Sequence, residues 1–226
     1  GVDNDGNGFV DDCQGWDFTT CSEFDATGAC VTAKARDNDP WDDYGHGTHV
    51  SGIIGAKGNN NGIGMAGIMW NVRIMPLKAL NSQGGGTTAD IIAAINYAVA
   101  NGAKIINMSY GSSTYSQSEY DAINAANTAG VLAIAAAGNE SGNNDIAPSY
   151  PAGYSLPNII SVAATDQNDM LASFSNFGVN TVHVTAPGVY ILSTLPDDGY
   201  FNKDFWPGTS MAAPHVAGTA GLLMTY

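Results

Sequence analysis

The sequence has little positive charge and no long hydrophobic run. Only 7 Lys and Arg residues stand against 21 Asp and Glu among 226 residues, which gives a formal net charge of −14. Nucleic acids and anionic membrane surfaces bind proteins through basic side chains, so we expect neither as a partner. The longest uninterrupted apolar run covers residues 131–137, whereas a membrane-spanning helix needs about 20 such residues. We therefore expect no membrane span.

Cysteine is also scarce, and its three residues, Cys13, Cys21 and Cys30, lie within the first 30 positions. One disulfide bond between two of them would suit an oxidising compartment, but the spacing does not select the pair. The chain is long enough for one sizeable core and too short for two ordinary domains and a linker. It starts at Gly1 and stops within a helical apolar pattern. We expect a single domain that is truncated at both ends.

After residue 45 the spacing of apolar residues alternates between that of strands and that of helices. Residues 91–99 place their apolar side chains on one helical face before Gly102. Ser116 and Glu119 form a capping box, which predicts a helix that reaches Gly130. The almost continuously apolar segments, each a predicted strand, are residues 72–80, 104–108, 131–137, 159–164 and 181–185.

Strands that alternate with helices in this way favour an α/β fold with three layers, in which helices flank both faces of a mostly parallel sheet. Ligand sites in such folds form at the carboxyl ends of the strands. Residues 1–45 are acidic and rich in Asn and Gly, which predicts a loop region. Residues 46–226 are predicted to form the main body.

Three polar side chains stand where such a sheet would place a site. His46 lies between two glycines at the start of a helical pattern, and Asn139 follows the apolar run at 131–137. Ser210 precedes small residues and Pro214, and a helix tolerates proline in its first turn. A hydroxyl at a helix N-terminus faces unpaired amides that stabilise an oxyanion. Each residue alone also fits a structural role, as a packed histidine, a turn residue or an N-cap.

Together, the segments GHGTHV, AAGN and GTSMAAPHVAG, in this order, resemble the blocks of the subtilisin-like serine proteases. The resemblance covers the chain from about Gly45 onward. It implies a subtilisin-like fold and a serine endopeptidase that acts through an acyl-enzyme. Ser210 would attack the peptide carbonyl and His46 would take and return the proton. Asn139 and the Ser210 N–H would hold the oxyanion.

The same resemblance implies a groove for an extended polypeptide substrate. A substrate would add as a strand to one edge segment and pair with an opposite wall, and a pocket of small residues would accept a bulky apolar side chain. Tyr150–Ala152 would form the far rim of that pocket. The implied substrate-binding residues are Gly84, Gly85, Gly86, Ser109, Tyr110, Gly111, Ala136, Ala137, Gly138 and Glu140.

The family's catalytic aspartate, on a strand of the form apolar-apolar-apolar-Asp-Thr/Ser-Gly, has no match in the sequence. Asp17 follows Trp16 and is an internal candidate, but it lies in the acidic loop region. We expect instead that the aspartate lies upstream of Gly1, so that residues 1–226 alone are inactive or nearly so. A family member that never had this aspartate is the remaining alternative.

Residues 3–12 follow the first two-thirds of an EF-hand-type calcium loop, with oxygen side chains at alternating positions and a central glycine. Gln14 stands where that loop requires a bidentate acid. The candidate calcium ligands are Asp3, Asp5, Asn7, Asp11 and Asp12, and a solvated acidic loop is the alternative. Residues 60–65 resemble a second calcium loop of the family. Calcium is the expected structural cofactor, and we expect no organic cofactor.

Two other enzyme classes conflict with the residues. Acid peptidases of the sedolisin type share the serine block but carry Glu and Asp where this chain has His46 and Asn139. Lipases and esterases require Gly-x-Ser-x-Gly, which the residues around Ser210 do not match. A non-catalytic module that binds peptides, or that binds in a calcium-dependent way, stays open. Our preferred hypothesis is a secreted, monomeric endopeptidase that acts on polypeptides.

Overall fold

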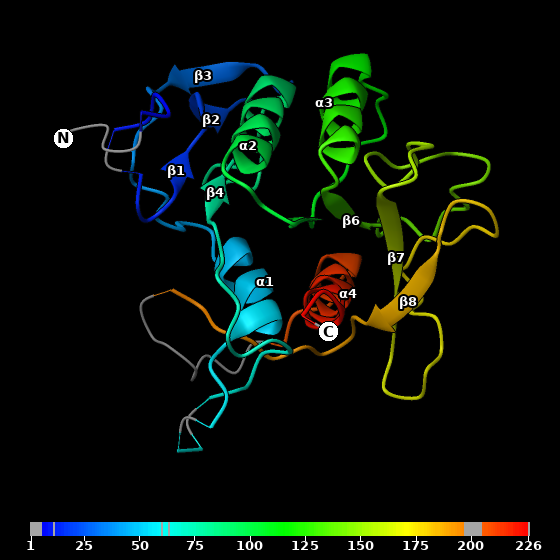
Figure 1. Cartoon of the computed structure of the whole chain (residues 1–226). Coiled ribbons are helices and arrows are strands. Elements are labelled where there is room, and N and C mark those ends of the chain that lie inside the picture. Colours follow the sequence, from blue (N-terminus) through cyan, green and yellow to red (C-terminus); the bar gives the residue numbers. More distant parts are fainter. Residues whose placement is uncertain (1–5, 11, 60, 63, 197–204, 226) are drawn as a thin grey trace.

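The centre of the molecule is a parallel sheet. The structure is a computed structural model that describes residues 6–10, 12–59, 61, 62, 64–196 and 205–225 (Figure 1). Four strands lie in the order β5-β6-β7-β8, and each neighbouring pair is parallel. Their bounds are β5 Ile105–Met108, β6 Leu132–Ala136, β7 Ile159–Thr165 and β8 Val184–Pro187. The parallel sheet predicted from the apolar segments is confirmed.

Helices cover both faces of this sheet. Their bounds are α1 His46–Gly55, α2 Thr88–Ala100, α3 Gln117–Thr128 and α4 Thr209–Leu223. On β6, Ala133 packs in one cluster with Ile95 of α2 and Ile123 of α3, whereas the next residue, Ile134, packs in another with Ala213 of α4. Because both faces of the strand are buried, its sequence is apolar without alternation. The three-layer α/β architecture is therefore confirmed.

The two predicted helices in the middle of the chain are present with slightly different ends. α2 begins at Thr88, and the Thr87 hydroxyl accepts a hydrogen bond from the Asp90 N–H at 3.1 Å. α3 begins after Ser116, whose hydroxyl accepts from the Glu119 N–H at 3.3 Å. Such side-chain acceptors satisfy amides that have no partner inside the helix.

Two predicted strands differ from the structure. Of residues 72–80, only β4 (Leu77–Lys78) is a strand, and it pairs in parallel with β1 (Trp16–Asp17) in a separate two-stranded sheet. The strand predicted at 181–185 begins three residues later, at the start of β8. The reason is the Asp145 carboxylate, which accepts the N–H groups of Asn180 and Thr181 and holds them outside the ladder.

The prediction that residues 1–45 form only loop is wrong. Besides β1, this region contains an antiparallel hairpin of β2 (Cys21–Phe24) and β3 (Cys30–Ala33), closed by a Cys21–Cys30 disulfide. Cys13 is exposed and free. All four residues of β3 are exposed, whereas Cys21 of β2 is buried. The hairpin therefore leaves little apolar alternation in the sequence.

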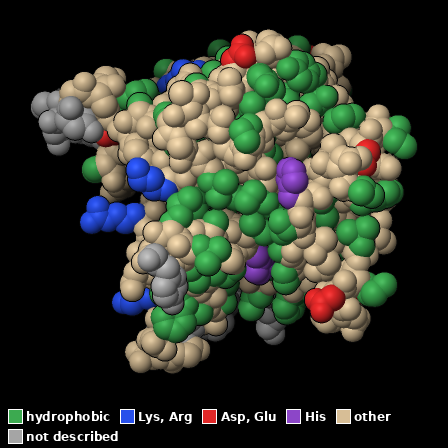
Figure 2. All heavy atoms as spheres, turned by 45° about the vertical axis from the view of Figure 1, so that its right-hand side comes forward, with side chains coloured by type: hydrophobic (Ala, Val, Ile, Leu, Met, Phe, Trp, Pro, Cys, Tyr) green, Lys and Arg blue, Asp and Glu red, His purple; other side chains and the backbone are tan. Residues whose placement is uncertain are grey.

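The acidic charge is spread unevenly over the surface. About half of the 21 acidic residues belong to residues 1–45. Figure 2 shows the side of the molecule that carries β7 and β8, where hydrophobic side chains form a broad area and acidic side chains are few. Among the described helices, none has the length and apolarity that a bilayer crossing requires.

Candidate active site

His46 and Ser210 lie at the same end of two helices that run side by side. Near the helix starts, Val50 of α1 belongs to one apolar cluster with Met211 of α4. Near the helix ends, a methyl group added to Gly218 would approach the Ile54 carbonyl oxygen at 3.4 Å. The helices therefore point in the same direction. Because His46 is the first residue of α1 and Ser210 the second of α4, the fold brings the two residues to one end of this pair.

Ser210 also lies at the carboxyl end of strand β5. Its Oγ donates to the carbonyl oxygen of Ser109 at 3.1 Å, and the Ser109 Oγ donates to the Ser210 carbonyl at 2.8 Å. Ser109 directly follows β5, which ends at Met108. This edge of the sheet is where parallel α/β folds form their sites, as the sequence predicts.

Pro214 explains why the Ser210 carbonyl needs a partner from outside the helix. The prediction that Pro214 lies in the first turn is wrong, because α4 begins at Thr209 and the proline stands inside the helix. Proline has no N–H to donate to the carbonyl four residues before it, which is that of Ser210. The Ser109 hydroxyl takes the place of that missing donor.

The Asn139 carboxamide is held against the start of α4 by Thr209. Its Oδ1 accepts from the Thr209 N–H at 2.9 Å and from the Thr209 hydroxyl at 3.0 Å. Since a backbone N–H can only donate, these bonds fix the oxygen of the carboxamide next to Thr209 and leave Nδ2 as its donor end. The Ser210 N–H is among the first amides of α4, which have no acceptor inside the helix. A side-chain donor and a backbone donor thus stand at one helix end.

Two electrostatic influences act on the His46 ring. Burial lowers the pKa of His46, and the negative charge of Asp42 partly offsets this. The imidazole is therefore neutral at pH 7 and can accept a proton. Asp42 itself binds the start of α1, where Oδ2 accepts from the Thr48 N–H and hydroxyl, each at 2.7 Å. Burial raises the pKa of Asp42, but these bonds and those from Gly45 and Tyr44 outweigh it and hold the pKa below its usual value.

Asp17 does not hold the His46 ring. It is buried with 1% exposure, and its carboxylate accepts from the Thr19 N–H and from Lys34 Nζ, at 2.7 and 2.6 Å. Within the described part of the chain, no hydrogen bond joins a carboxylate to the imidazole of His46. Asp17, the internal candidate for the third catalytic residue, thus stabilises the β1 region instead of orienting His46.

The loop that carries Asn139 is held by Asn176, a residue that sequence reasoning missed. Asn176 is buried, and its Oδ1 accepts from the N–H groups of Glu140 and Gly142, both at 2.9 Å. Its Nδ2 donates to the Glu140 carboxylate at 2.8 Å and to the Ala137 carbonyl at 3.2 Å. Asn176 stands between Ser175 and Phe177 in a segment that carries no motif, and only the three-dimensional contacts reveal its role.

The predicted substrate-binding residues fall into several environments. Ala136 packs in the core beneath α4, and the Ala137 side chain is fully buried. The Tyr110 hydroxyl donates to Glu119 at 3.1 Å, and burial together with this carboxylate raises the pKa of Tyr110. Beyond Gly111, Ser112 exchanges two backbone hydrogen bonds of 2.8 Å with Tyr150, the predicted rim residue.

Gly84 and Gly85 lie within a turn that Asn81 closes, and Gly86 follows it. The Asn81 side-chain oxygen accepts the Gly85 N–H at 3.1 Å, and the Asn81 N–H donates to the Gly85 carbonyl at 2.8 Å. Gly84 has a φ of +74°, which favours glycine. The Gly85 backbone is therefore used within the turn, and so is the Gly84 N–H, which donates to the Asn81 carbonyl at 2.9 Å.

The predicted calcium ligands are only partly within the described structure. Asp3, Asp5 and Asp11, and Asn60 and Ile63 of the second loop, lie outside the described residues. Asp12 accepts from Asn7 Nδ2 at 2.8 Å and from the Tyr97 hydroxyl. Among the described residues, no three His, Cys, Asp or Glu side chains form a group suited to a metal ion.

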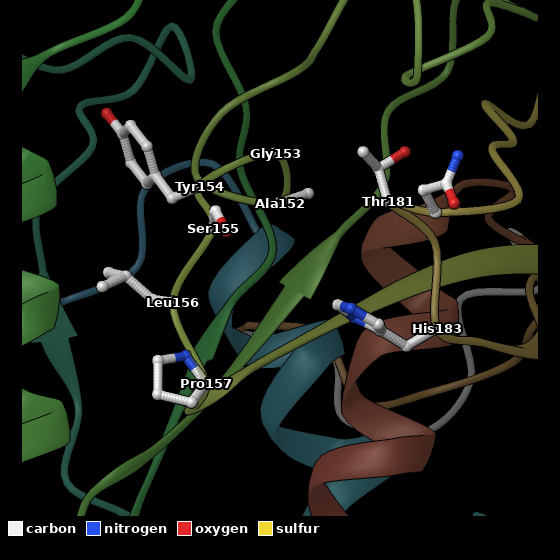
Figure 3. A pocket seen from close by; sticks show the side chains of 9 residues that line it. Ala152, Gly153, Tyr154, Ser155, Leu156, Pro157, Thr181 and His183 are labelled. Carbon is white, nitrogen blue, oxygen red and sulfur yellow. The ribbon is translucent and has the colours of Figure 1, made fainter.

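A hollow of about 500 Å³ lies at the end of the sheet where the strands begin, opposite the end that carries Ser109 (Figure 3). The lining residues are 152–157, which precede β7, and Asn180, Thr181 and His183, which precede β8. His183 points into the hollow, and its Nδ1 accepts the Ser161 N–H at 2.9 Å. The hollow is therefore at the amino ends of the strands, away from Ser109 and Asn139.

The remaining histidines have structural contacts. His49 is fully buried, its Nε2 lies 3.1 Å from the Ile191 carbonyl, and its ring stacks on Trp206 at 5.0 Å. Burial lowers the pKa of His49 to about 4. The Nδ1 of His215 lies 2.8 Å from the Met211 carbonyl.

Comparisons with known proteins agree with this geometry. The chain is 46% identical over 188 residues to the thermophilic serine proteinase of Bacillus sp. (strain AK1), covering 83% of this chain and 44% of that protein. It is 42% identical over 209 residues to thermitase of Thermoactinomyces vulgaris, covering 92% of this chain and 66% of thermitase. The chain therefore spans less than half the length of the first of these relatives.

A solved structure of a cold adapted subtilisin-like serine proteinase matches with a TM-score of 0.73 and 36% identity, over 84% of this chain and 64% of that one. The family model described as "Subtilase family" matches residues 17–226. The α/β fold described above is thus subtilisin-like, and the chain belongs to the subtilase family of peptidases.

Proposed function

We propose that the protein is a serine endopeptidase that cleaves polypeptides through an acyl-enzyme, with Ser210 as nucleophile, His46 as general base and acid, and Asn139 as oxyanion donor. The observation that carries this proposal is the convergence of three features at the start of α4. These are the Ser210 hydroxyl, the Ser210 N–H and the Asn139 carboxamide locked by Thr209. Relatives named as serine proteinases support it, and they give no support to a non-catalytic module.

The proposed chemistry follows from these positions. The Ser210 oxygen bonds to the peptide carbonyl carbon while its proton passes to the neutral imidazole of His46. The carbonyl oxygen becomes an oxyanion, which accepts from Asn139 Nδ2 and the Ser210 N–H. When the C–N bond breaks, His46 gives the proton to the leaving amine. Water then attacks the acyl-enzyme by the same route and restores Ser210.

The hydrogen bond from Ser210 Oγ to the Ser109 carbonyl describes a resting arrangement. A substrate N–H that bonds to the Ser109 carbonyl would compete with the Ser210 hydroxyl for that acceptor. Substrate binding would in this way release Ser210 Oγ to turn toward His46. The Ser109 carbonyl would thus accept a hydrogen bond from the substrate when one is bound and from the Ser210 hydroxyl when none is.

The substrate would lie as an extended chain between the segments Gly84–Gly86 and Ser109–Gly111. Ala136, Ala137, Gly138 and Glu140 follow β6 next to Asn139 and would shape the site that takes the side chain before the scissile bond. We propose a preference for a bulky apolar side chain there. The support is the small size of these residues and the resemblance to the family.

The third catalytic group would come from a segment outside the printed sequence. Strand β5 pairs with β6 on one side only within the described residues, and Ile105 and Ile106 are only half-buried. On the same strand the Oδ1 of Asn107 is buried without a hydrogen-bond partner in the described structure. A parallel strand added to this edge would end beside Ser109 and could present an aspartate to His46. Residues 1–226 alone would then be inactive or nearly so.

Secretion, a monomeric state and structural calcium complete the proposal. A disulfide suits an extracellular protein, and the residues of the hairpin that carries it are largely exposed. Calcium would depend mainly on Asp3, Asp5 and Asp11, because Asp12 already accepts two hydrogen bonds. A fall in melting temperature on adding a chelator to the protein would support calcium, and no fall would remove it.

Covalent labelling of the full-length natural protein with a fluorophosphonate probe tests the proposed function. We expect the label on Ser210, and we expect H46A to abolish it. A matched control is H183A, which removes the histidine at the opposite edge of the sheet and should label normally. A folded protein that takes no label, or one labelled equally well without His46, contradicts the proposal.

A further inference from the structure

Asn139, the proposed oxyanion donor, stands on a loop that has little burial of its own. The loop leaves the sheet after β6, which ends at Ala136, and both Asn139 and Glu140 are exposed. Gly138 has a φ of +113°, a backbone conformation that favours glycine. A catalytic side chain must stay within about 0.5 Å of its working position, and the residues packed around it supply that precision. The position of Asn139 therefore depends on residues outside its own loop.

Asn176 binds this loop on the side that precedes Asn139. Its side chain is buried, with 3% exposure. Its backbone N–H donates to the Gly138 carbonyl at 2.9 Å, and its Nδ2 lies 3.2 Å from the Ala137 carbonyl. A methyl group added to Gly138 would collide with this Nδ2, so the glycine allows the carboxamide to approach. The chain just before Asn139 is thus fixed to Asn176 through its carbonyl groups.

The same carboxamide binds the loop on the side that follows Asn139. Its Oδ1 accepts the N–H groups of Glu140 and Gly142, both at 2.9 Å. Its Nδ2 donates to Glu140 Oε2 at 2.8 Å, and this carboxylate oxygen also accepts the Asn139 N–H at 3.0 Å. Glu140 therefore folds back onto its own loop and links Asn176 to the backbone of Asn139. One buried carboxamide thus joins the chain on both sides of the oxyanion donor.

Asn176 is itself held in place by Asn144. Asn144 is fully buried, and its Oδ1 lies 3.1 Å from Asn176 Nδ2. The Asn144 N–H donates to the carbonyl of Phe177, the residue after Asn176, at 2.7 Å. Because Asn176 Oδ1 faces two N–H groups and Nδ2 faces only acceptors, the orientation of the carboxamide is fixed.

We infer that Asn176, together with the Glu140 carboxylate that it binds, is a positioning residue for Asn139 and raises kcat by holding the Asn139 carboxamide where the oxyanion forms. This inference rests on the proposed function and adds to it a residue outside the three sequence blocks. Since Asn176 is buried, it acts through the loop and not on the substrate. Thr209 fixes Oδ1 of Asn139, and Asn176 fixes the backbone from which that side chain starts.

The kinetic reason is that negative charge develops on the carbonyl oxygen only as the reaction proceeds. A displaced donor weakens binding of the transition state and leaves binding of the substrate nearly unchanged. The loss of a positioning residue therefore lowers kcat and has little effect on KM. A displacement of about 1 Å can cost about 10²-fold in rate. Because Thr209 still binds Asn139 in an Asn176 variant, we expect a smaller loss.

A double-mutant cycle on the full-length natural protein, followed by steady-state hydrolysis of a peptide, tests this inference. We expect N176A to lower kcat about tenfold and to leave KM within about twofold. In the N139A background the donor is already absent, so N176A should lower kcat by less than about twofold further. A purely structural role would give the same fall in kcat in both backgrounds, or no fall in either. Each of these two results overturns the inference.

N158A is the matched control for lost stability. Asn158 is also a buried asparagine, with 7% exposure, and its Nδ2 donates to the Val131 carbonyl at 2.9 Å, at the start of β6 rather than at its end. N158A should lower the melting temperature as N176A does but leave kcat unchanged. Equal falls in kcat for N158A and N176A would show that lost stability alone accounts for the effect, and would refute the positioning role.

E140A carries the test should N176A not fold, because Glu140 is exposed. It removes the carboxylate that links Asn176 to the Asn139 N–H, and we expect about a threefold fall in kcat. That fall should vanish in the N139A background. A threefold fall in both backgrounds would contradict the inference.

Fluorophosphonate labelling of Ser210 separates the two proposals. If the natural protein takes the label and hydrolyses peptides while N176A keeps its full kcat, the role of Asn176 is wrong and the proposed function stands. A natural protein that neither labels nor hydrolyses peptides overturns the proposed function, and this inference with it.

Discussion

The two ends of the central sheet, where its parallel strands begin and where they end, carry different groups. The amino edge, before β7 and β8, holds a hollow of about 500 Å³ into which His183 points. The carboxyl edge, after β5 and β6, holds Ser109 and Asn139 against the start of α4. Among the residues that the structure describes, only the carboxyl ends of the strands combine a hydroxyl, unpaired helix amides and a fixed carboxamide. The proposed active site therefore rests on this convergence of donors and a nucleophile, and not on cavity volume.

The largest expected effect that sharpens this contrast comes from Asn139. N139A should lower kcat by about 10²–10³-fold with little change in KM, because the lost donor acts on the oxyanion. That magnitude is known from subtilisin, a member of the same family, and is carried over here. H183A, at the amino edge, should leave kcat unchanged. Steady-state hydrolysis of a peptide by both variants checks this, and equal losses would break the contrast.

The bond between Ser109 and Ser210 should have an intermediate effect. S109A leaves the Ser210 carbonyl without its donor, and we expect about a tenfold loss in kcat, in line with the 1–3 kcal/mol cost of an unsatisfied polar group. P214A restores an N–H four residues after Ser210, so S109A should cost less than about threefold in that background. Measuring kcat for the two single variants and the double variant tests whether the Ser109 hydroxyl replaces the missing N–H of Pro214. A full tenfold loss in the P214A background would refute this role of Ser109.

The smallest expected effect concerns the start of α1. D42N should lower the free energy of unfolding by about 1–2 kcal/mol at pH 7, because the charged Asp42 accepts two hydrogen bonds from Thr48 in the first turn of the helix that carries His46. The pKa of Asp42 is lowered in the folded protein, so its contribution is present above pH 3.8 and is lost as the pH falls through that lowered pKa. Urea unfolding at several pH values measures it.

D43N is the control for D42N, because the Asp43 side chain is 46% exposed and forms an ion pair with Lys78 at 2.9 Å rather than a bond to the start of α1, so we expect a smaller loss of stability. A difference between D42N and the natural protein that persists below the lowered pKa would show that Asp42 acts by something other than its charge.

Sequence reasoning worked where a residue's role depends on its neighbours along the chain. The strand that ends before Ser109 and the strand that ends before Asn139 follow from local apolar spacing. The helix start at Ser210 is predicted from the small residues that follow it and from Pro214, although that proline lies inside the helix. These three segments are expected to lie close together because the carboxyl ends of parallel strands lie at the same end of a sheet. The family resemblance then joined His46 to them.

The failures concern residues whose partners are distant in the sequence. Asn176 holds the Asn139 loop from 37 positions away, and Asp145 displaces the start of β8 by binding Asn180 and Thr181. The spacing of apolar residues along the chain does not predict such contacts. Sequence reasoning missed the hairpin at Cys21–Ala33, because all four residues of β3 are exposed and show no apolar alternation. Pro214 was placed one turn too early because its missing donor is replaced by Ser109, a residue on another element.

The most direct test of the account is a crystal structure of the full-length protein after reaction with a fluorophosphonate. We predict a covalent bond from Ser210 Oγ to phosphorus and a phosphonyl oxygen about 2.7–3.1 Å from both Asn139 Nδ2 and the Ser210 N–H. A phosphonyl oxygen that contacts neither donor, or an adduct on any residue other than Ser210, would contradict the account.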